Sequence, residues 1–517
     1  MKVKKMLSLF VAATIGITMI SGCDNNEKEN QTENVTLKWI MAGQGMQQDS
    51  QKVWDLFNEK LQNYMPGVTV EFDPITFTDF AEKWQLSCAA GEEADLVWTG
   101  YAFDIPDQIK KGAYMPMGDL LDEYAPALKE ELPQWAWDLG SYNGEIYVMP
   151  IMQQFASKSA LMAPEELTSQ YMDRQKVIET NKNGMGTSQE GWDAIEEYLA
   201  NLKAAGKIGK GVYADYVSAN RHNVDDGAFW DSPVTNVFCK QNEDGTFTVV
   251  NDCDMPSVKL TYKNMADWYA KGYIIPDILT VSDLASHVGK VDGVVLTTSQ
   301  VLKGEKERKS QQYGIDIDLI ETGDNPYKII AGSCKTGIAI PQTSQHPKEA
   351  IQLLELLNTE KGKELLNLLV YGIEGEHYEV VGENRINTFD YSGSSPKSNS
   401  KYGIDKWAVG NTYYSYETMD VPEGWNSYIK EINKEASSNV SPIMGFSFDS
   451  DPVKVELAQI QAIKTQYETV LKNGAMGVDW ENYYNEYEQK LNKAGQEKVR
   501  LEVEKQLNEW VKAKNNK

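Results

Sequence analysis

The side chains of this chain favour stacking and hydrogen bonding over proton transfer. The sequence holds 13 Trp and 27 Tyr, against 4 His and five Arg. Aromatic rings bury large flat surfaces, and Tyr and Trp each add one polar group. Histidine, the side chain best suited to acid–base work and metal binding near neutral pH, is scarce. The composition therefore indicates packing or stacking more than metal or acid–base chemistry.

Sequence motifs of common catalytic and metal sites are missing. We find no HExxH, CxxC, GxSxG or phosphate-loop pattern. The four His are far apart in sequence, and the acidic run FDSDP does not have the spacing of an EF-hand. A pair of glycosidase carboxylates could not be recognised among 76 acidic residues. We therefore expect no catalytic residue, no metal and no cofactor.

The net charge narrows the possible partners. Lys and Arg total 50 and Asp and Glu total 76, which gives a formal charge of −26. Nucleic acid needs clustered basic residues, so it is an unsuitable partner. The folded body is equally unsuited to an anionic bilayer surface. The length of 517 residues exceeds one ordinary core and predicts at least two domains or lobes.

The first residues have the features of an export signal. Lys2, Lys4 and Lys5 precede an uncharged run from Met6 to Ile20, which is too short to span a bilayer. The run ends in Ile20-Ser21-Gly22-Cys23, which resembles a bacterial lipobox with Cys23 as the lipidated residue. Two acyl chains on that residue would anchor the protein stably. The alternative is an ordinary secretory signal followed by an incidental Cys.

A polar linker separates this signal from the folded body. Residues 24–34, DNNEKENQTEN, contain no apolar side chain and are expected to be disordered. With residues 1–22 removed as a signal, the charge becomes −29, which is 47 bases minus 76 acids. Of the remaining cysteines, Cys239 and Cys253 flank an EDG turn and could pair across a hairpin, although four scattered Cys do not form a disulfide framework.

The body alternates strands and helices. Residues 35–41, 68–72 and 95–98 have strand patterns, and helical patterns follow the first two. This order predicts a parallel sheet, whose ligands lie beyond the carboxyl ends of the strands. Several side chains therefore fall on one functional edge, namely Gln44, Gln48, Asp49, Trp98, Thr99 and Tyr101. Helix capping by Gln44, Gln48 or Asp49 is the competing interpretation.

The rest of the chain continues this alternation. Asn143-Gly144 within SYNGEIYVMP predicts a tight hairpin. Helices are expected at 192–202, at 256–271, after Ser344 and at the C-terminal end, and strands at 289–298 and 331–341.

Four stretches together resemble the family 1 extracellular solute-binding proteins of ABC importers, which are similar to maltose-binding protein. These are the lipobox with its linker, SYNGEIYVMP, GKVDGVVLTT and TGIAIPQTSQHPKEAIQLLELLNTEKGKELLNLL. YGIEGEHY and WAVGN resemble the lipoprotein subgroup associated with polysaccharide or aldouronate-type uptake. The segment after Tyr378 departs from maltose-binding protein itself, so its site positions are not transferred.

The resemblance implies a bilobal, periplasmic-binding-protein-like α/β fold. We expect lobe one at 35–150 plus 326–370, and lobe two at 151–325 plus 371–517. The crossings between lobes are expected near residues 147–150, 324–328 and 370–372.

The resemblance also implies a sugar ligand, which presents an apolar face and a rim of hydroxyls. Flat aromatics and short polar side chains match these features. The candidate ligand contacts are Gln44, Gln48, Asp49, Trp98, Thr99, Tyr101, Gln153, Arg221, Asp226, Trp230, Trp268, Trp407 and Asn411. For the Trp residues, and most strongly for Trp268, the competing interpretation is packing in the core. For Arg221 the competing interpretation is a solvated loop.

The scarcity of Arg favours a neutral or weakly acidic oligosaccharide, because polyuronic acids are best held by several guanidinium groups. We therefore expect a lipid-anchored, monomeric binding protein on the extracellular face, with no enzymatic activity. It would capture an oligosaccharide by hinge closure and deliver it to ABC permease subunits. The alternatives are a surface glycoside hydrolase and a tethered receptor that serves no transporter.

Overall fold

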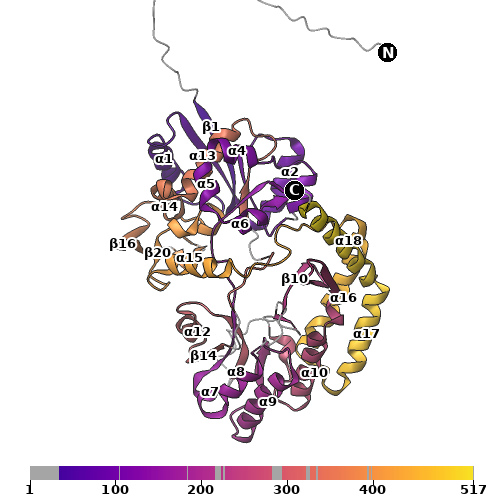
Figure 1. Ribbon diagram of the computed structural model, residues 1–517. Helices are drawn as coiled ribbons and strands as arrows, with labels where there is room; N and C mark the ends of the chain where they lie inside the picture. The colour runs from indigo at the N-terminus through magenta and orange to yellow at the C-terminus, as the bar shows by residue number, and fades with distance from the viewer. Residues whose placement is uncertain are drawn as a thin grey trace, which may run out of the picture.

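The computed structural model describes residues 34–103, 105–182, 184–215, 223–224, 228–281, 294–321, 326–332, 336–389, 391–392, 395–397 and 399–515. These residues form two α/β lobes joined by extended segments (Figure 1). Cys23, Arg221 and Asp226 lie outside the described residues. Within the described residues, no helix is both long and apolar enough to cross a membrane.

Lobe one is built on a five-stranded sheet. Its strand order is β2 (Val68–Thr76), β1 (Val35–Gly43), β3 (Leu96–Gly100), β15 (Thr336–Ala339) and β6 (Val148–Pro150). β1 pairs in parallel with both β2 and β3, as the sequence predicted. The chain enters β1 at the end of lobe one that is far from the second lobe, so the parallel strands run toward that lobe (Figure 1).

Helices cover both faces of this sheet. They are α1 (Ser50–Leu61), α2 (Phe77–Ala90), α3 (Ile105–Lys110), α4 (Gly118–Tyr124), α5 (Pro126–Glu131), α6 (Gln134–Leu139), α13 (Pro347–Asn358), α14 (Lys363–Tyr371) and α15 (Trp425–Ala436). Small sheets are added by β4 (Ser141–Tyr142) with β5 (Glu145–Ile146), by β16 (Tyr378–Gly382), β17 (Arg385–Thr388) and β20 (Glu417–Thr418), and by β18 (Tyr391–Ser392) with β19 (Ser395–Pro396). Asn143 has a φ of 53°, the left-handed conformation that the predicted Asn-Gly turn requires.

Lobe two contains two four-stranded sheets. The first has the order β14 (Ile317–Glu321), β7 (Ser159–Pro164), β13 (Val294–Gln300) and β8 (Val212–Asp215). It is packed by α7 (Glu165–Tyr171), α8 (Arg174–Thr180), α9 (Gln189–Ala204), α10 (Pro256–Ala270) and α12 (Glu305–Tyr313). The second sheet has the order β12 (Phe247–Asn251), β11 (Val237–Gln241), β10 (Ala228–Val234) and β9 (Asn223–Val224).

Three C-terminal helices pack against the second of these sheets. They are α16 (Lys454–Lys472), α17 (Trp480–Lys493) and α18 (Gln496–Asn515), and they form one hydrophobic core with β11 and β12. α18 runs along the side of the molecule, and the C-terminus lies beside lobe one (Figure 1). An ion pair of 2.5 Å joins Lys110 of α3 to Asp449, whose backbone is held by Gln506 of α18.

The crossings between lobes are hydrogen-bonded to one another. Ser157 pairs with Lys328 through two backbone bonds of 2.9 and 3.0 Å, and Ile329 pairs with Val440. The second crossing thus lies where it was expected, near residue 328. The first passes at Ser157 and not at 147–150, because β6 is a strand of the lobe-one sheet, and the third passes near Val440 and not at 370–372. Val370 and Tyr371 are buried inside the core of lobe one.

The division of the chain between lobes therefore differs from the expected one at residues 151–156 and after residue 370. The large lobe-one core takes residues from Leu37 to Ala156 and from Ile329 to Met444. The expectation placed everything after residue 370 in lobe two. It failed because Tyr371, Tyr378 and Tyr402 are aromatic residues of this core, and only their long-range packing shows which lobe they join.

The possible disulfide between Cys239 and Cys253 is not formed. Cys88, Cys239 and Cys253 are all free thiols. In the pairing of β11 with β12, Cys239 lies opposite Val249, and Cys253 follows beyond the end of β12. The hairpin prediction was right, but the strand register keeps the two sulfur atoms from facing each other.

A buried lysine in lobe one gives a testable pH dependence. Burial lowers the pKa of Lys406 to about 8, and the charges of Asp420 and Glu417 oppose this shift only in part. The unfolded chain holds this proton up to the ordinary lysine pKa of 10.5. Between about pH 8 and pH 10.5 the unfolded state therefore binds more protons than the folded state. The contribution of Lys406 to the free energy of unfolding should therefore rise with pH from about pH 8 to about pH 10, while the buried thiols of Cys239 and Cys253, whose pKa burial raises, contribute in the opposite direction above about pH 9.

Denaturant unfolding of wild type and Lys406→Met across this pH range measures how much of the pH dependence of the free energy of unfolding comes from Lys406. Burial also lowers the pKa of Lys328 to about 8, so the variant should keep the part of the rise that Lys328 contributes. A variant with the full wild-type slope would show that Lys406 does not contribute to it.

Candidate functional site at the carboxyl edge of the lobe-one sheet

The loops after three parallel strands meet at one edge of lobe one. The loop after β1 contains Gln44 to Asp49, α2 begins directly after β2 at Phe77, and Tyr101 follows β3. The short helix η4 (Lys406–Ala408) adds Trp407 to the same edge. In parallel sheets this edge is where ligands bind.

An aromatic cluster forms the centre of this edge. The ring of Trp407 stacks on Phe77 with centroids 5.2 Å apart and planes 18° apart. It also lies 6.3 Å from the ring of Tyr101 at an angle of 45°. Tyr101 is 56% exposed, while Phe77 and Trp407 are half-buried. The cluster thus offers a firmly packed aromatic surface of which Tyr101 is the most accessible part.

Asp405 lies beneath this surface and was not predicted. Its side chain is 1% exposed and accepts a hydrogen bond of 3.3 Å from Nε2 of Gln44. Burial raises the pKa of Asp405, although hydrogen bonds from Ser395, Gln44 and Trp407 act in the opposite direction. Burial, followed by the charge of Asp405, also raises the pKa of Tyr101. Asp405 is therefore a positioning residue that orients Gln44 and Trp407 from below.

The loop after β1 is fixed by the chain segment before Asp405. Gln47 donates to Ser400 over 3.1 Å and accepts from the backbone of Gly403 over 3.0 Å. Asp49 occupies the N-cap position of α1, but its carboxylate makes no capping bond and lies 3.2 Å from Nε2 of His377. The capping interpretation is therefore wrong for the Asp49 side chain. Gln44 and Gln48 are exposed at this edge.

Four predicted ligand contacts are instead buried in the protein. Trp98 is 0% exposed and packs edge-on against Phe80 at 5.2 Å, so it cannot stack on a ligand in this conformation. Thr99 is equally buried and accepts a hydrogen bond of 3.0 Å from Tyr114. Trp268 packs against Trp192 in the core of lobe two. Asn411 is buried and accepts from the backbone of Tyr413.

The remaining predicted contacts lie in lobe two or between the lobes. Trp230 of β10 is mostly buried, with Nζ of Lys240 5.1 Å from its ring centre. Gln153 is half-buried in the first crossing and donates to Thr336 over 2.8 Å. The edge of lobe one thus brings together Gln44, Gln48, Asp49, Tyr101 and Trp407, and leaves Gln153 and Trp230 outside this group.

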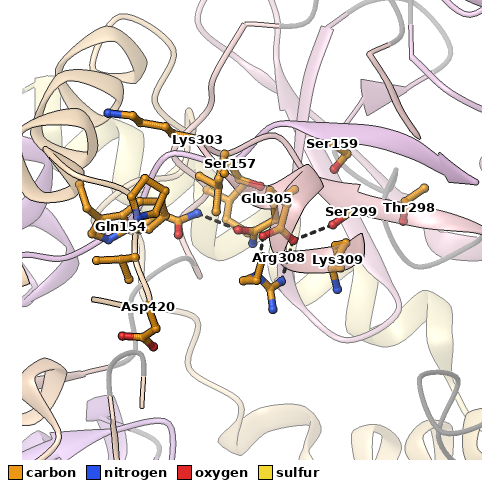
Figure 2. A pocket seen from close by; sticks show the side chains of 17 residues that line it. Gln154, Ser157, Ser159, Thr298, Ser299, Lys303, Glu305, Arg308, Lys309 and Asp420 are labelled. Atoms are coloured by element: carbon orange, nitrogen blue, oxygen red, sulfur yellow. Dashed lines mark hydrogen bonds and ion pairs between the residues drawn. The ribbon is translucent and has the colours of Figure 1, made fainter. Parts of the chain in front are cut away.

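A second feature is a pocket of about 760 Å³ that both lobes and a crossing segment line. Figure 2 shows Arg308 and Ser299 both directed at Glu305, with Gln154 close by. Arg308 holds Glu305 through two bonds of 2.7 Å. None of the predicted ligand contacts that lie among the described residues lines this pocket, because its residues carry no distinctive sequence motif.

The positioning role of Asp405 leads to a prediction with opposite effects on binding and stability. Asp405→Asn keeps the shape but weakens the hydrogen bonds that orient Gln44 and Trp407. We expect ligand affinity to fall by about 3- to 10-fold, the range of one ordinary hydrogen bond, because Asn weakens these bonds without removing them all. Because burial raises the pKa of Asp405, its ionisation at neutral pH costs folding free energy, so the variant should be at least as stable.

Calorimetric titration and thermal melting at pH 7 measure the two effects separately. A variant that loses stability and affinity together would show that Asp405 only supports the fold.

The two lobes, their hydrogen-bonded crossings and an aromatic edge directed toward the second lobe define the class of bilobal solute-binding proteins. The family described as bacterial extracellular solute-binding protein matches residues 46–364, and the chain belongs to this family. A domain of unknown function, DUF3502, matches residues 442–512, which include α16, α17 and most of α18.

Individual proteins extend this similarity over most of the chain. A carbohydrate ABC transporter substrate-binding protein of Streptococcus pneumoniae serotype 4 is 26% identical over 472 residues, covering 87% of this chain and 86% of that protein. The crystal structure of the N-glycan transport solute binding protein NgtS from Streptococcus pneumoniae has a TM-score of 0.70 at 23% identity, covering 93% and 99% of the two chains. Its complex with Man1GlcNAc has a TM-score of 0.59 at 22% identity, covering 92% and 100%. At these identities the two structures establish the bilobal fold.

Proposed function

We propose that this protein captures an oligosaccharide between its lobes and delivers it to an ABC permease. The observation that carries the proposal is the exposed Tyr101 ring beside Trp407 at the carboxyl edge of lobe one. The apolar face of a sugar packs on such rings, and Gln44 and Gln48 at the same edge can bond its hydroxyls. The strands that carry the edge run toward lobe two, which can close over a bound ligand.

The comparisons support a saccharide as the ligand class. One relative is named as a carbohydrate transporter component, and a structural neighbour binds Man1GlcNAc.

The anchoring of the protein is a further part of the proposal. Cys23 within ISGC would carry the lipid, and the polar residues 24–34 would separate the membrane from the body. The protein then acts as a monomer on the outer face of the cell membrane, with the permease as its partner. A Cys23→Ser variant should appear in the culture medium, whereas wild type should remain with the membrane fraction.

Calorimetry with neutral gluco-, manno-, xylo- and galacto-oligosaccharides tests the ligand class. We expect binding by at least one series, with a higher melting temperature for the complex. We also expect chromatography of the incubated sugars to show no cleavage. An absence of heat and of a thermal shift across all four series would contradict the proposal, and cleavage products would favour a hydrolase.

A further inference from the structure

The pocket of about 760 Å³ lies where the two lobes touch beside the first crossing. Lobe two contributes β7, β13 and α12, and lobe one contributes the segment from Asp420 to Pro422 and Trp425. Nζ of Lys303 reaches the carbonyl of Glu423 over 2.6 Å. A Cβ added to Gly304 would lie 2.5 Å from Cγ of Pro422, so the lobes are in close contact here.

The pocket lining is rich in neutral hydrogen-bonding groups. The hydroxyls of Ser157, Ser159 and Thr298 are half-buried in the wall and make no side-chain hydrogen bond to another described residue. Nε2 of Gln154 donates to Gln300 over 2.8 Å, which leaves the other amide atoms of this pair available. A hydroxyl can donate and accept, as the hydroxyls of a sugar require of their partners.

Two charged residues of the pocket, Arg308 and Glu305, are paired with each other, while Nζ of Lys303 bonds the carbonyl of Glu423, and Lys309 and Asp420 add one charge of each sign. Arg308 binds Glu305 through two parallel hydrogen bonds, and Glu305 also accepts from Ser299 over 2.9 Å. Glu305 engages Nε and Nη2 of this guanidinium and neutralises its charge, so Arg308 offers less to a carboxylate or phosphate of a ligand than an unpaired Arg would. The half-buried ring of Trp425 adds an apolar surface to the wall. The lining therefore combines neutral hydrogen-bonding groups with one apolar ring, which suits a polyhydroxylated ligand.

We propose that this hinge-side pocket is a second saccharide subsite that takes a neutral sugar unit. The volume lies within the range of about 300–1,000 Å³ that is usual for small-molecule sites. This inference rests on the proposed function and extends it, because the pocket shares no residue with the aromatic edge. Since both lobes form its walls, an occupant contacts both and shifts the equilibrium between lobe arrangements.

The test compares calorimetric titrations of three variants with wild type. Ser159→Ala with Thr298→Val removes two pocket hydroxyls at nearly constant shape, and Tyr101→Ala alters the aromatic edge. Ser169→Ala with Thr465→Val makes the same chemical changes at exposed positions on α7 and α16. The probes are neutral gluco-, manno-, xylo- and galacto-oligosaccharides, from disaccharides to hexasaccharides. Trp425→Leu is a second pocket variant in case the double variant fails to fold.

The pocket variants should weaken binding by about 5- to 30-fold, the range for two lost hydrogen bonds, while the control matches wild type. If one sugar chain reaches both sites, the loss appears only for longer oligosaccharides at unchanged stoichiometry. If two separate molecules bind, the stoichiometry falls from two to one. Pocket variants with wild-type affinity and stoichiometry for every probe would overturn the inference while the proposed function stands. Wild type that binds no probe would overturn both.

Discussion

Replacing Tyr101 by Ala should lower the affinity for the oligosaccharide by about 10- to 30-fold, since such a truncation of a central aromatic contact costs about 1.4–2 kcal/mol of binding. Tyr101 is the most exposed ring of the aromatic cluster, so most of its surface is free to pack on a sugar. The same exposure means that its loss removes little from the core. The melting temperature of the unliganded protein should therefore change little, and calorimetric titration should show the defect.

Tyr101→Phe is the matched control for this variant. It keeps the ring and removes only the hydroxyl, so it should bind within a few-fold of wild type. Tyr101→Ala with unchanged affinity for every bound sugar would place the ligand away from this edge.

Replacing Trp98 by Ala should have its main effect on stability. Trp98 is fully buried among Phe77, Phe80 and Trp407, and its removal leaves a large cavity. Truncation of a buried Trp costs about 3–5 kcal/mol of unfolding free energy. Denaturant unfolding should show this loss, and affinity should fall only through movement of the neighbouring Trp407.

Trp98→Phe separates lost volume from lost hydrogen bonding. Nε1 of Trp98 is buried and has no hydrogen-bond partner among the described residues, so Phe should be tolerated much better than Ala. If Trp98→Ala kept wild-type stability and lost binding, Trp98 would be a ligand contact, as its sequence position first suggested.

Local patterns predicted most individual elements of the fold. The expected strands at 35–41 and 68–72 became β1 and β2 with longer C-terminal ends, and the helix expected at 256–271 became α10. These elements follow from apolar periodicity and turn residues, which are local properties. The membership of residues 371–444 in lobe one is set by long-range packing of Tyr371, Tyr378 and Tyr402, which no local pattern shows.

The candidate site was predicted only in part, because local patterns again could not show long-range packing. The strand ends correctly placed Gln44 and Tyr101 at one edge. The positions of the strand ends do not show which aromatic side chain faces outward. In the structure Trp98 lies in the core and Tyr101 is exposed. Asp405 was missed because it is separated by 361 positions from Gln44, its hydrogen-bond partner. Within the sequence it is one acid among 76, and only the fold brings it beneath the aromatic cluster.

Small-angle X-ray scattering with and without a saturating oligosaccharide tests the central claim most directly. If the lobes close over a sugar, the radius of gyration should decrease and the scattering curve should approach that of a closed bilobal shape. Tyr101→Ala should require a higher sugar concentration for the same change. An identical scattering curve at saturation, with binding confirmed by calorimetry, would contradict capture by lobe closure.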